Sequence, residues 1–228
     1  MTGSVAPITK GDIICLYFCP TDFWLAKHGI QPPKGAGMPL WKKLADCEAV
    51  HLTQDGLPPG PDGPIAGRLV RLNLGRPVHK PTMLELRAVP DRCLLRPAGD
   101  YAPLDQKTKP YPVKLVPAHH RLELSYYGLA MSLANLSVAD VGYLLPYSPE
   151  YSGGSVRLLG TTLACAIALA EAEQWLRLAR AIMDLAEPPS YDFLAEAAKE
   201  LLHLPSFPQQ WEECEACTFV HQAARYVV

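Results

Sequence analysis

The chain has 228 residues, of which 49% are hydrophobic and 19% are charged, which is enough apolar material for one domain with a sizeable core. Its 21 Lys and Arg residues nearly balance its 23 Asp and Glu residues, giving a formal net charge of −2 at pH 7. Because no basic block or stripe is present in the sequence, we expect no nucleic-acid partner.

The N-terminal half shows short apolar runs and two-residue alternation, both of which favour strands. The segments that predict strands are 12–19, 23–30, 65–74, 83–89 and 120–127. A Pro- and Lys-rich connector covers about 95–118, and the chain as a whole has 23 prolines, which predict many loops. We therefore expect residues 1–127 to be a strand-rich part with Pro-rich loops.

From residue 128 the hydrophobic period changes from two to 3.6 residues, which predicts helices over residues 128–228. The predicted helices are 138–145, 156–185, 191–204 and 211–226. Ser190 stands where a serine would cap the third of them. Strands followed by helices predict an α+β fold: one domain over residues 1–228, with a small antiparallel sheet packed against a helical C-terminal half.

Two blocks near opposite ends of the chain follow a recognisable pattern. The residues that carry it are Gly11-Asp12, Trp24, Gly29 and Val50-His51-Leu52 in the first block, and Ala195-Glu196, Cys214-Glu215, Cys217 to Val220 and Arg225-Tyr226 in the second. This pattern resembles the lecithin:retinol acyltransferase-like (LRAT-like) thiol enzymes, which belong to the papain-like group. The resemblance implies a papain-like thiol fold with an insertion in the middle of the chain.

The resemblance also implies a catalytic site with a Cys nucleophile, either Cys217 or Cys214, and a His base. The family's base position is occupied here by Phe23, which cannot accept a proton, so His51 is the remaining candidate. A thiol without a base attacks slowly. The leading hypothesis is therefore a non-catalytic interaction or assembly module on a degenerate LRAT-like scaffold, part of a virus or a multi-subunit particle, with a protein partner or self-association.

The alternative hypothesis is a thiol acyltransferase or phospholipase-like hydrolase acting on a lipid ester. The longest apolar stretch, residues 158–170, is too short to cross a bilayer. The chain begins without a signal-peptide pattern and has seven Cys, an odd number, which together favour a reducing, cytoplasmic location.

Two further groups of residues are weighed as metal sites. Cys214-x-x-Cys217 would be half of a zinc site, with Cys15 and Cys19 as the other half. On a strand, Cys15 and Cys19 would lie about 13 Å apart, and the adjacent pair His119-His120 would face opposite sides. We therefore expect no metal and no cofactor.

Overall fold

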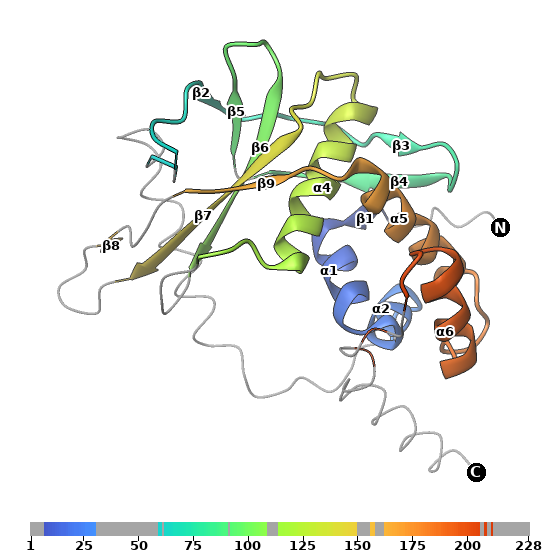
Figure 1. Ribbon diagram of the computed structural model, residues 1–228. Helices are drawn as coiled ribbons and strands as arrows, with labels where there is room; N and C mark the ends of the chain where they lie inside the picture. Colours follow the sequence, from blue (N-terminus) through green and yellow to red (C-terminus); the bar gives the residue numbers. More distant parts are fainter. Residues whose placement is uncertain are drawn as a thin grey trace. The chain divides into compact units, whose positions relative to one another are not determined.

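The computed structural model describes residues 7–30, 59–60, 62–90, 92–108, 114–149, 156–157, 162–205, 208 and 211. The chain divides into two compact units, each assembled from segments that are distant in sequence. Unit 1 takes residues 1–34, 76–87 and 170–228, and unit 2 takes residues 35–75 and 88–169. Both units combine helices with strands, which confirms the α+β class (Figure 1).

Unit 1 contains a small sheet of three strands and four helices in the described residues. In chain order these are β1 (Ile8–Thr9), α1 (Lys10–Phe18), α2 (Pro20–Lys27), β3 (Val78–His79), β4 (Leu84–Arg87), α5 (Leu169–Met183) and α6 (Tyr191–Glu200). The central strand β4 pairs in parallel with β1 and antiparallel with β3.

The first two helices stand where the sequence predicts strands, so those two predictions are wrong. At the start of α1, Thr9 Oγ1 accepts from the Asp12 backbone N–H at 3.1 Å, and Asp12 Oδ2 accepts from the Thr9 backbone N–H at 2.7 Å. This reciprocal capping satisfies two donors that a helix start leaves open. Cys19 caps α2, which begins at Pro20, a favoured first helical residue. The hydrophobic period of a short apolar run does not distinguish a helix from a strand. In α1 and α2 the capping residues are the local signal that favours a helix.

Unit 2 is a mixed sheet with one long helix. Its described elements are β2 (Arg68–Val70), β5 (Arg92–Leu95), β6 (Tyr101–Thr108), α4 (Ala118–Leu133), β7 (Val141–Pro149), β8 (Val156–Arg157) and β9 (Leu163–Ala166). The strand order is β2-β5-β6-β7-β8, and β9 also pairs with β7. Strands β6 and β7 are parallel, with α4 as the crossover between them, and the other pairs are antiparallel. Figure 1 shows α4 alongside β6 and β7.

The sheet of unit 2 is therefore built partly from residues that the sequence assigns to helices. Residues 138–145, a predicted helix, lie largely in β7, and the predicted helix 156–185 contains β9 before α5 begins. Residues 120–127, a predicted strand, lie in α4. Every residue from 122 to 131 in α4 is buried, so the helix is covered on all sides. Such a helix has no polar face, and its sequence therefore lacks the helical period that would have identified it.

Three predicted elements are confirmed by the structure. Strand β4 lies within 83–89, β2 lies within 65–74, and α6 begins at Tyr191. As predicted, Ser190 caps α6, because its Oγ accepts from the Phe193 backbone N–H at 3.2 Å. The predicted helix 211–226 lies outside the described residues except for Trp211.

Two glycines allow α4 to approach the sheet closely. A Cβ on Gly142 of β7 would lie 3.3 Å from Leu124 Cβ and 2.7 Å from Ile167 Cδ1. A Cβ on Gly128 of α4 would lie 2.9 Å from Ile167 Cγ2. The buried Ser125 Oγ accepts from the Ala168 backbone N–H at 3.1 Å and ties α4 to the segment after β9. These contacts fix the middle of α4 against β7 and the segment that follows β9.

Candidate metal centre

Strand β6 presents two charged side chains on one face. Asp105 and Lys107 are two residues apart, so the strand repeat directs both side chains to the same side of the sheet. The Asp105 side chain is fully buried, and the Lys107 side chain is 22% exposed. Buried charges are retained in proteins when they are paired or bind a metal, so this position requires partners.

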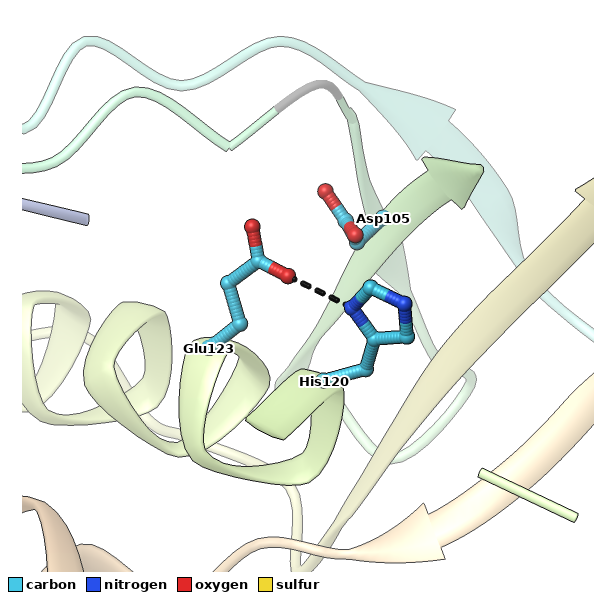
Figure 2. A group of neighbouring side chains, drawn as sticks. All are labelled: Asp105, His120 and Glu123. Carbon is cyan, nitrogen blue, oxygen red and sulfur yellow. Dashed lines mark hydrogen bonds and ion pairs between the residues drawn. The ribbon is translucent and has the colours of Figure 1, made fainter. Parts of the chain in front are cut away.

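Helix α4 supplies those partners from its first two turns. His120 and Glu123 are three residues apart and therefore lie on the same side of the helix. His120 Nδ1 lies 2.9 Å from Glu123 Oε2, and Nδ1–H is the donor because a carboxylate only accepts. Figure 2 shows these two side chains directed from α4 toward Asp105 on β6.

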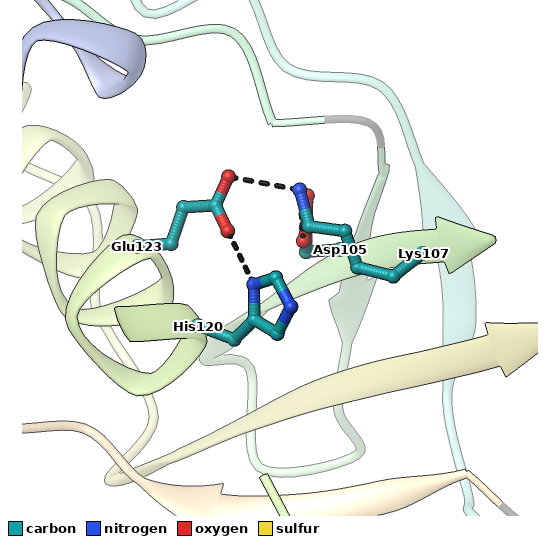
Figure 3. Close-up of polar contacts among 4 residues, drawn as sticks. All are labelled: Asp105, Lys107, His120 and Glu123. Atoms are coloured by element: carbon teal, nitrogen blue, oxygen red, sulfur yellow. Dashed lines mark hydrogen bonds and ion pairs between the residues drawn. The ribbon is translucent and has the colours of Figure 1, made fainter. Parts of the chain in front are cut away.

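The Lys107 ammonium bridges the two carboxylates. Its Nζ lies 2.9 Å from Glu123 Oε1 and 3.0 Å from Asp105 Oδ2 (Figure 3). The contact with Glu123 is a hydrogen bond, whereas the contact with Asp105 Oδ2 has ion-pair distance without hydrogen-bond geometry. Within this group of four side chains, the one ammonium lies between the two carboxylates and pairs with both.

The three ligand-type residues are close enough to hold one ion. One oxygen of Asp105, one nitrogen of His120 and one oxygen of Glu123 all lie within 4.8 Å of one another, and all three residues are buried. Ligands that share an ion at roughly 2.0–2.5 Å are separated by distances of this order. Carboxylate oxygens suit Mg²⁺ and Mn²⁺, and an imidazole nitrogen is a ligand that Mn²⁺ also accepts. The cluster therefore fits a divalent cation without rearrangement of the backbone.

Two features of the sequence conceal this site. Asp105 and Lys107 lie in the segment that the sequence predicts to be a Pro- and Lys-rich connector, and the polar run from Asp105 to Thr108 shows no apolar alternation that would predict a strand. The strand assigned to 120–127 placed His119 and His120 on opposite faces. In α4 their ring centroids are 4.0 Å apart, and His120 joins the carboxylates. The strand predicted for His120 is therefore wrong, while the group with metal-ligand geometry takes in His120 and not His119.

The structure does not test the candidate thiol site, because its residues lie outside the described part of the chain. These residues are His51, Cys214 and Cys217. Phe23, which occupies the base position by resemblance, is buried within α2. The catalytic assignment to these residues therefore stays a prediction.

The described free thiols are poor nucleophiles. Burial raises the pKa of Cys93 to about 12 and that of Cys165 to about 11. Burial, together with the nearby carboxylates of Asp22 and Asp12, raises the pKa of Cys15 to about 12. A thiol with such a pKa is almost entirely protonated at neutral pH, and the thiolate is the reactive form.

The distance argument against a zinc site at Cys15 and Cys19 is wrong, because these residues are one helical turn apart. The Cys19 backbone N–H donates to the Cys15 carbonyl oxygen at 2.7 Å. Cys19 is disulfide-bonded. Among the described residues, the group with metal-ligand geometry is the one on β6 and α4.

Comparisons with known proteins add little to this geometry. No protein-family model matches the sequence, and no curated protein matches it. A solved structure titled "Crystal structure of SSO0001" is similar at 14% sequence identity and a TM-score of 0.44, over 92% of this chain and 90% of that chain. A likeness at this level carries no inference about function. In the described part of the chain, no helix is long and apolar enough to span a membrane.

Proposed function

We propose that this protein is a divalent-cation-dependent hydrolase of phosphodiester bonds, with nucleic acid as its substrate class. The observation that carries the proposal is the convergence of two buried carboxylates, an imidazole and an ammonium between β6 and α4. Mg²⁺-type cations are commonly held by one or two carboxylates and complete their coordination with water and substrate phosphate oxygens. Lysine is a compact point charge that suits phosphate.

Each of the four side chains has a role in this chemistry. A bound cation would polarise a phosphoryl oxygen and lower the pKa of a bound water. Asp105 and Glu123 would hold the cation; His120 orients the Glu123 carboxylate through its 2.9 Å hydrogen bond and would offer a nitrogen ligand. Lys107 stabilises the negative charge that grows on the phosphate as water attacks phosphorus. The attacking water loses a proton to solvent, the phosphorus–oxygen bond to the leaving group breaks, and the leaving oxygen takes up a proton, giving a phosphomonoester and an alcohol.

This proposal disagrees with two predictions from the sequence, namely that the protein has no nucleic-acid partner and that it binds no metal. Both expectations rested on missing sequence signals: a basic stripe and a compact set of ligands. A bound cation supplies positive charge locally, so a hydrolase of this type does not require a basic stripe. The overall charge of −2 is compatible with local attraction of a phosphate at one site.

Cleavage assays with matched carboxylate variants test the proposal. The substrates are fluorescently labelled single-stranded and double-stranded DNA, with bis-p-nitrophenyl phosphate as a phosphodiester that lacks bases. We expect cleavage with Mn²⁺ or Mg²⁺, none with EDTA, and at least ~100-fold less in Asp105→Asn, the order found when a group stabilising transition-state charge is removed. Asp140→Asn is the control, because this carboxylate is 95% exposed and lies in the same unit. Equal rates for Asp105→Asn and the wild type would refute the proposal.

The sequence places another carboxylate, Asp91, immediately before Arg92, and Asp91 lies outside the described residues. Arg92 pairs with Leu104, the residue before Asp105. The cleavage rate of the Asp91→Asn variant tests whether the Asp91 carboxylate also contributes to the reaction.

A non-catalytic interaction module is the second candidate function. The ion pairs of Lys107 with Asp105 and Glu123 favour it, because they occupy the carboxylates that a catalytic metal would need. Because Lys107 already pairs with both carboxylates, the four side chains form an ion-pair network that can serve a purely structural role. Absence of Mn²⁺ binding at millimolar concentration in calorimetry would favour this candidate. The LRAT-like scaffold and the thiol hydrolase with Cys217 or Cys214 and His51 stay proposals, which pH-dependent alkylation of the individual cysteines tests.

A further inference from the structure

The Lys107 ammonium occupies the place that a metal ion would take. Its Nζ lies 2.9 Å from Glu123 Oε1 and 3.0 Å from Asp105 Oδ2, and these two carboxylates provide two of the three ligand residues. In Figure 3 the end of Lys107 reaches over Asp105 toward Glu123. A divalent ion bound to the same carboxylates would stand within a few ångströms of the ammonium, where two positive charges repel strongly at low dielectric.

We propose that Lys107 is a tethered cation that competes with the divalent metal for Asp105 and Glu123, so that metal binding and release of Lys107 are one event. The inference rests on the proposed metal site and concerns how that site is regulated. Without metal, Lys107 pairs with both carboxylates and offsets part of their charge. With metal, the ammonium leaves them and becomes free to contact a substrate phosphate.

The Lys107 side chain has the freedom that this exchange requires. It is 22% exposed, whereas the Asp105 and Glu123 side chains are 0% and 4% exposed. Lysine has a flexible four-carbon stem, so the ammonium can move toward solvent while the stem stays packed. The carboxylates belong to a paired strand and to a buried helix, and they are the fixed part of the site. Release of the cation from fixed anions is therefore the movement that the geometry permits.

Competition predicts that removing the Lys107 charge strengthens metal binding. Lys107→Met leaves two buried carboxylates facing each other, which destabilises the metal-free protein. A bound divalent ion then supplies the missing charge, so the variant gains more from metal than the wild type does. If Lys107 only assisted metal binding, Lys107→Met would bind the metal more weakly than the wild type. If Lys107 only stabilised the fold, the two proteins would bind the metal equally.

The test is a Mn²⁺ titration of the full chain, followed by the electron paramagnetic resonance signal of free Mn²⁺. We expect Lys107→Met to bind Mn²⁺ at least ~10-fold more tightly than the wild type, because loss of one nearby positive charge removes a strong repulsion. We also expect a larger increase in its melting temperature on addition of Mn²⁺. Lys114→Met, the same change at an exposed lysine of the same unit, should match the wild type.

The outcomes separate this inference from the proposed function. Equal or weaker Mn²⁺ binding by Lys107→Met, with binding by the wild type, overturns the competition but leaves the metal site standing. Absence of binding by both proteins overturns the metal site and the competition together. Cleavage of DNA that is lost in Lys107→Met while Mn²⁺ binding tightens is the combination that both proposals predict.

A measurement on the wild type covers the case in which Lys107→Met does not fold. Acetylation of lysines by an N-hydroxysuccinimide ester, quantified residue by residue by mass spectrometry, reports how accessible each ammonium is. We expect acetylation of Lys107 to rise severalfold when the protein is saturated with Mn²⁺, with Lys114 unchanged. Unchanged acetylation of Lys107 in the metal-saturated protein overturns the inference.

Discussion

Each of the two units buries a histidine, and the two imidazoles differ in what surrounds them. His79 in unit 1 is 1% exposed, and its Nδ1 lies 2.8 Å from Thr82 Oγ1. Its Nε2 has no hydrogen-bond partner in the described residues. His120 in unit 2 is 6% exposed, and its Nδ1 lies 2.9 Å from a Glu123 carboxylate that also pairs with Lys107.

The comparison teaches that burial of a histidine does not by itself make a site. His79 has a hydroxyl as its hydrogen-bond partner, and burial lowers its pKa, which disfavours the charged imidazole. A carboxylate partner with a second carboxylate nearby creates local negative charge that favours a cation. The same residue type is therefore structural in unit 1 and part of a candidate metal centre in unit 2.

The largest expected effect comes from Glu123→Gln in unit 2. This change removes the charge that both His120 and Lys107 contact, and it removes one metal ligand. We expect loss of Mn²⁺ binding, at least ~100-fold slower DNA cleavage, and unfolding free energy lower by about 2 kcal/mol, since the Lys107 and His120 donors lose their charged acceptor. Calorimetry, cleavage assays and urea unfolding measure these effects. Mn²⁺ binding of wild-type strength in this variant would contradict the assigned ligand set.

A smaller effect is expected where the packing of α4 positions the site without touching it. Gly142→Ala brings a Cβ within 3.3 Å of Leu124 Cβ, which cannot move away as a flexible side-chain end could. Overpacking of this kind costs about 1–3 kcal/mol, and we expect Mn²⁺ affinity to fall as Glu123 shifts relative to Asp105.

Gly11→Ala in α1 is the control for Gly142→Ala. Its new Cβ meets nothing closer than 3.6 Å, and alanine favours a helix. We expect stability that is unchanged or slightly higher, and unchanged Mn²⁺ affinity. Equal losses of stability in both variants would contradict the role given to Gly142.

The buried histidine of unit 1 predicts an effect of pH on stability. Burial, the largest cause, lowers the pKa of His79 below its ordinary value of 6.5, and Arg177 lowers it further while Glu173 opposes this. The unfolded chain then binds more protons than the folded chain below pH 6.5, so stability falls as pH decreases through that range. We expect His79→Gln to reduce this loss between pH 7 and pH 5, measured by urea unfolding, with DNA cleavage at pH 7.5 unchanged. An identical slope in variant and wild type would rule out His79 as its source.

The smallest effect concerns the thiols. Because burial holds the pKa of Cys93 and Cys165 near 12 and 11, we expect both to react with iodoacetamide at pH 7.5 much more slowly than a free thiol. Mass spectrometry of labelled peptides measures each rate. Fast labelling of Cys217 or Cys214 below pH 7 would favour the thiol hydrolase over the metal-dependent hydrolase.

The sequence predicts those parts of the fold in which local signals agree. Helix α6 has a serine cap and a clear amphipathic period, and β4 alternates buried and exposed residues. Helix α4 lacks both signals, since Pro117 provides no side-chain cap and the residues from 122 to 131 are all buried. The period of a segment covered on all sides carries no information about its structure, so tertiary packing alone settles it.

The candidate metal centre was out of reach for a related reason. Asp105 and Lys107 come from one element, and His120 and Glu123 come from another that the sequence assigned to the wrong class. With α4 as a strand, His120 and Glu123 would face opposite sides, and no ligand set would form. If residues 120–127 are predicted to be a helix, His120 and Glu123 lie on one face of it, because residues three apart in a helix are neighbours. That prediction would have indicated two of the three ligand residues.

The most direct measurement is anomalous diffraction from crystals grown or soaked with Mn²⁺. The account predicts one strong peak between β6 and α4, about 2.0–2.3 Å from carboxylate oxygens of Asp105 and Glu123 and from an imidazole nitrogen of His120, with the Lys107 ammonium displaced from both carboxylates. A crystal at millimolar Mn²⁺ in which this position shows no peak and Lys107 still bridges Asp105 and Glu123 would contradict it.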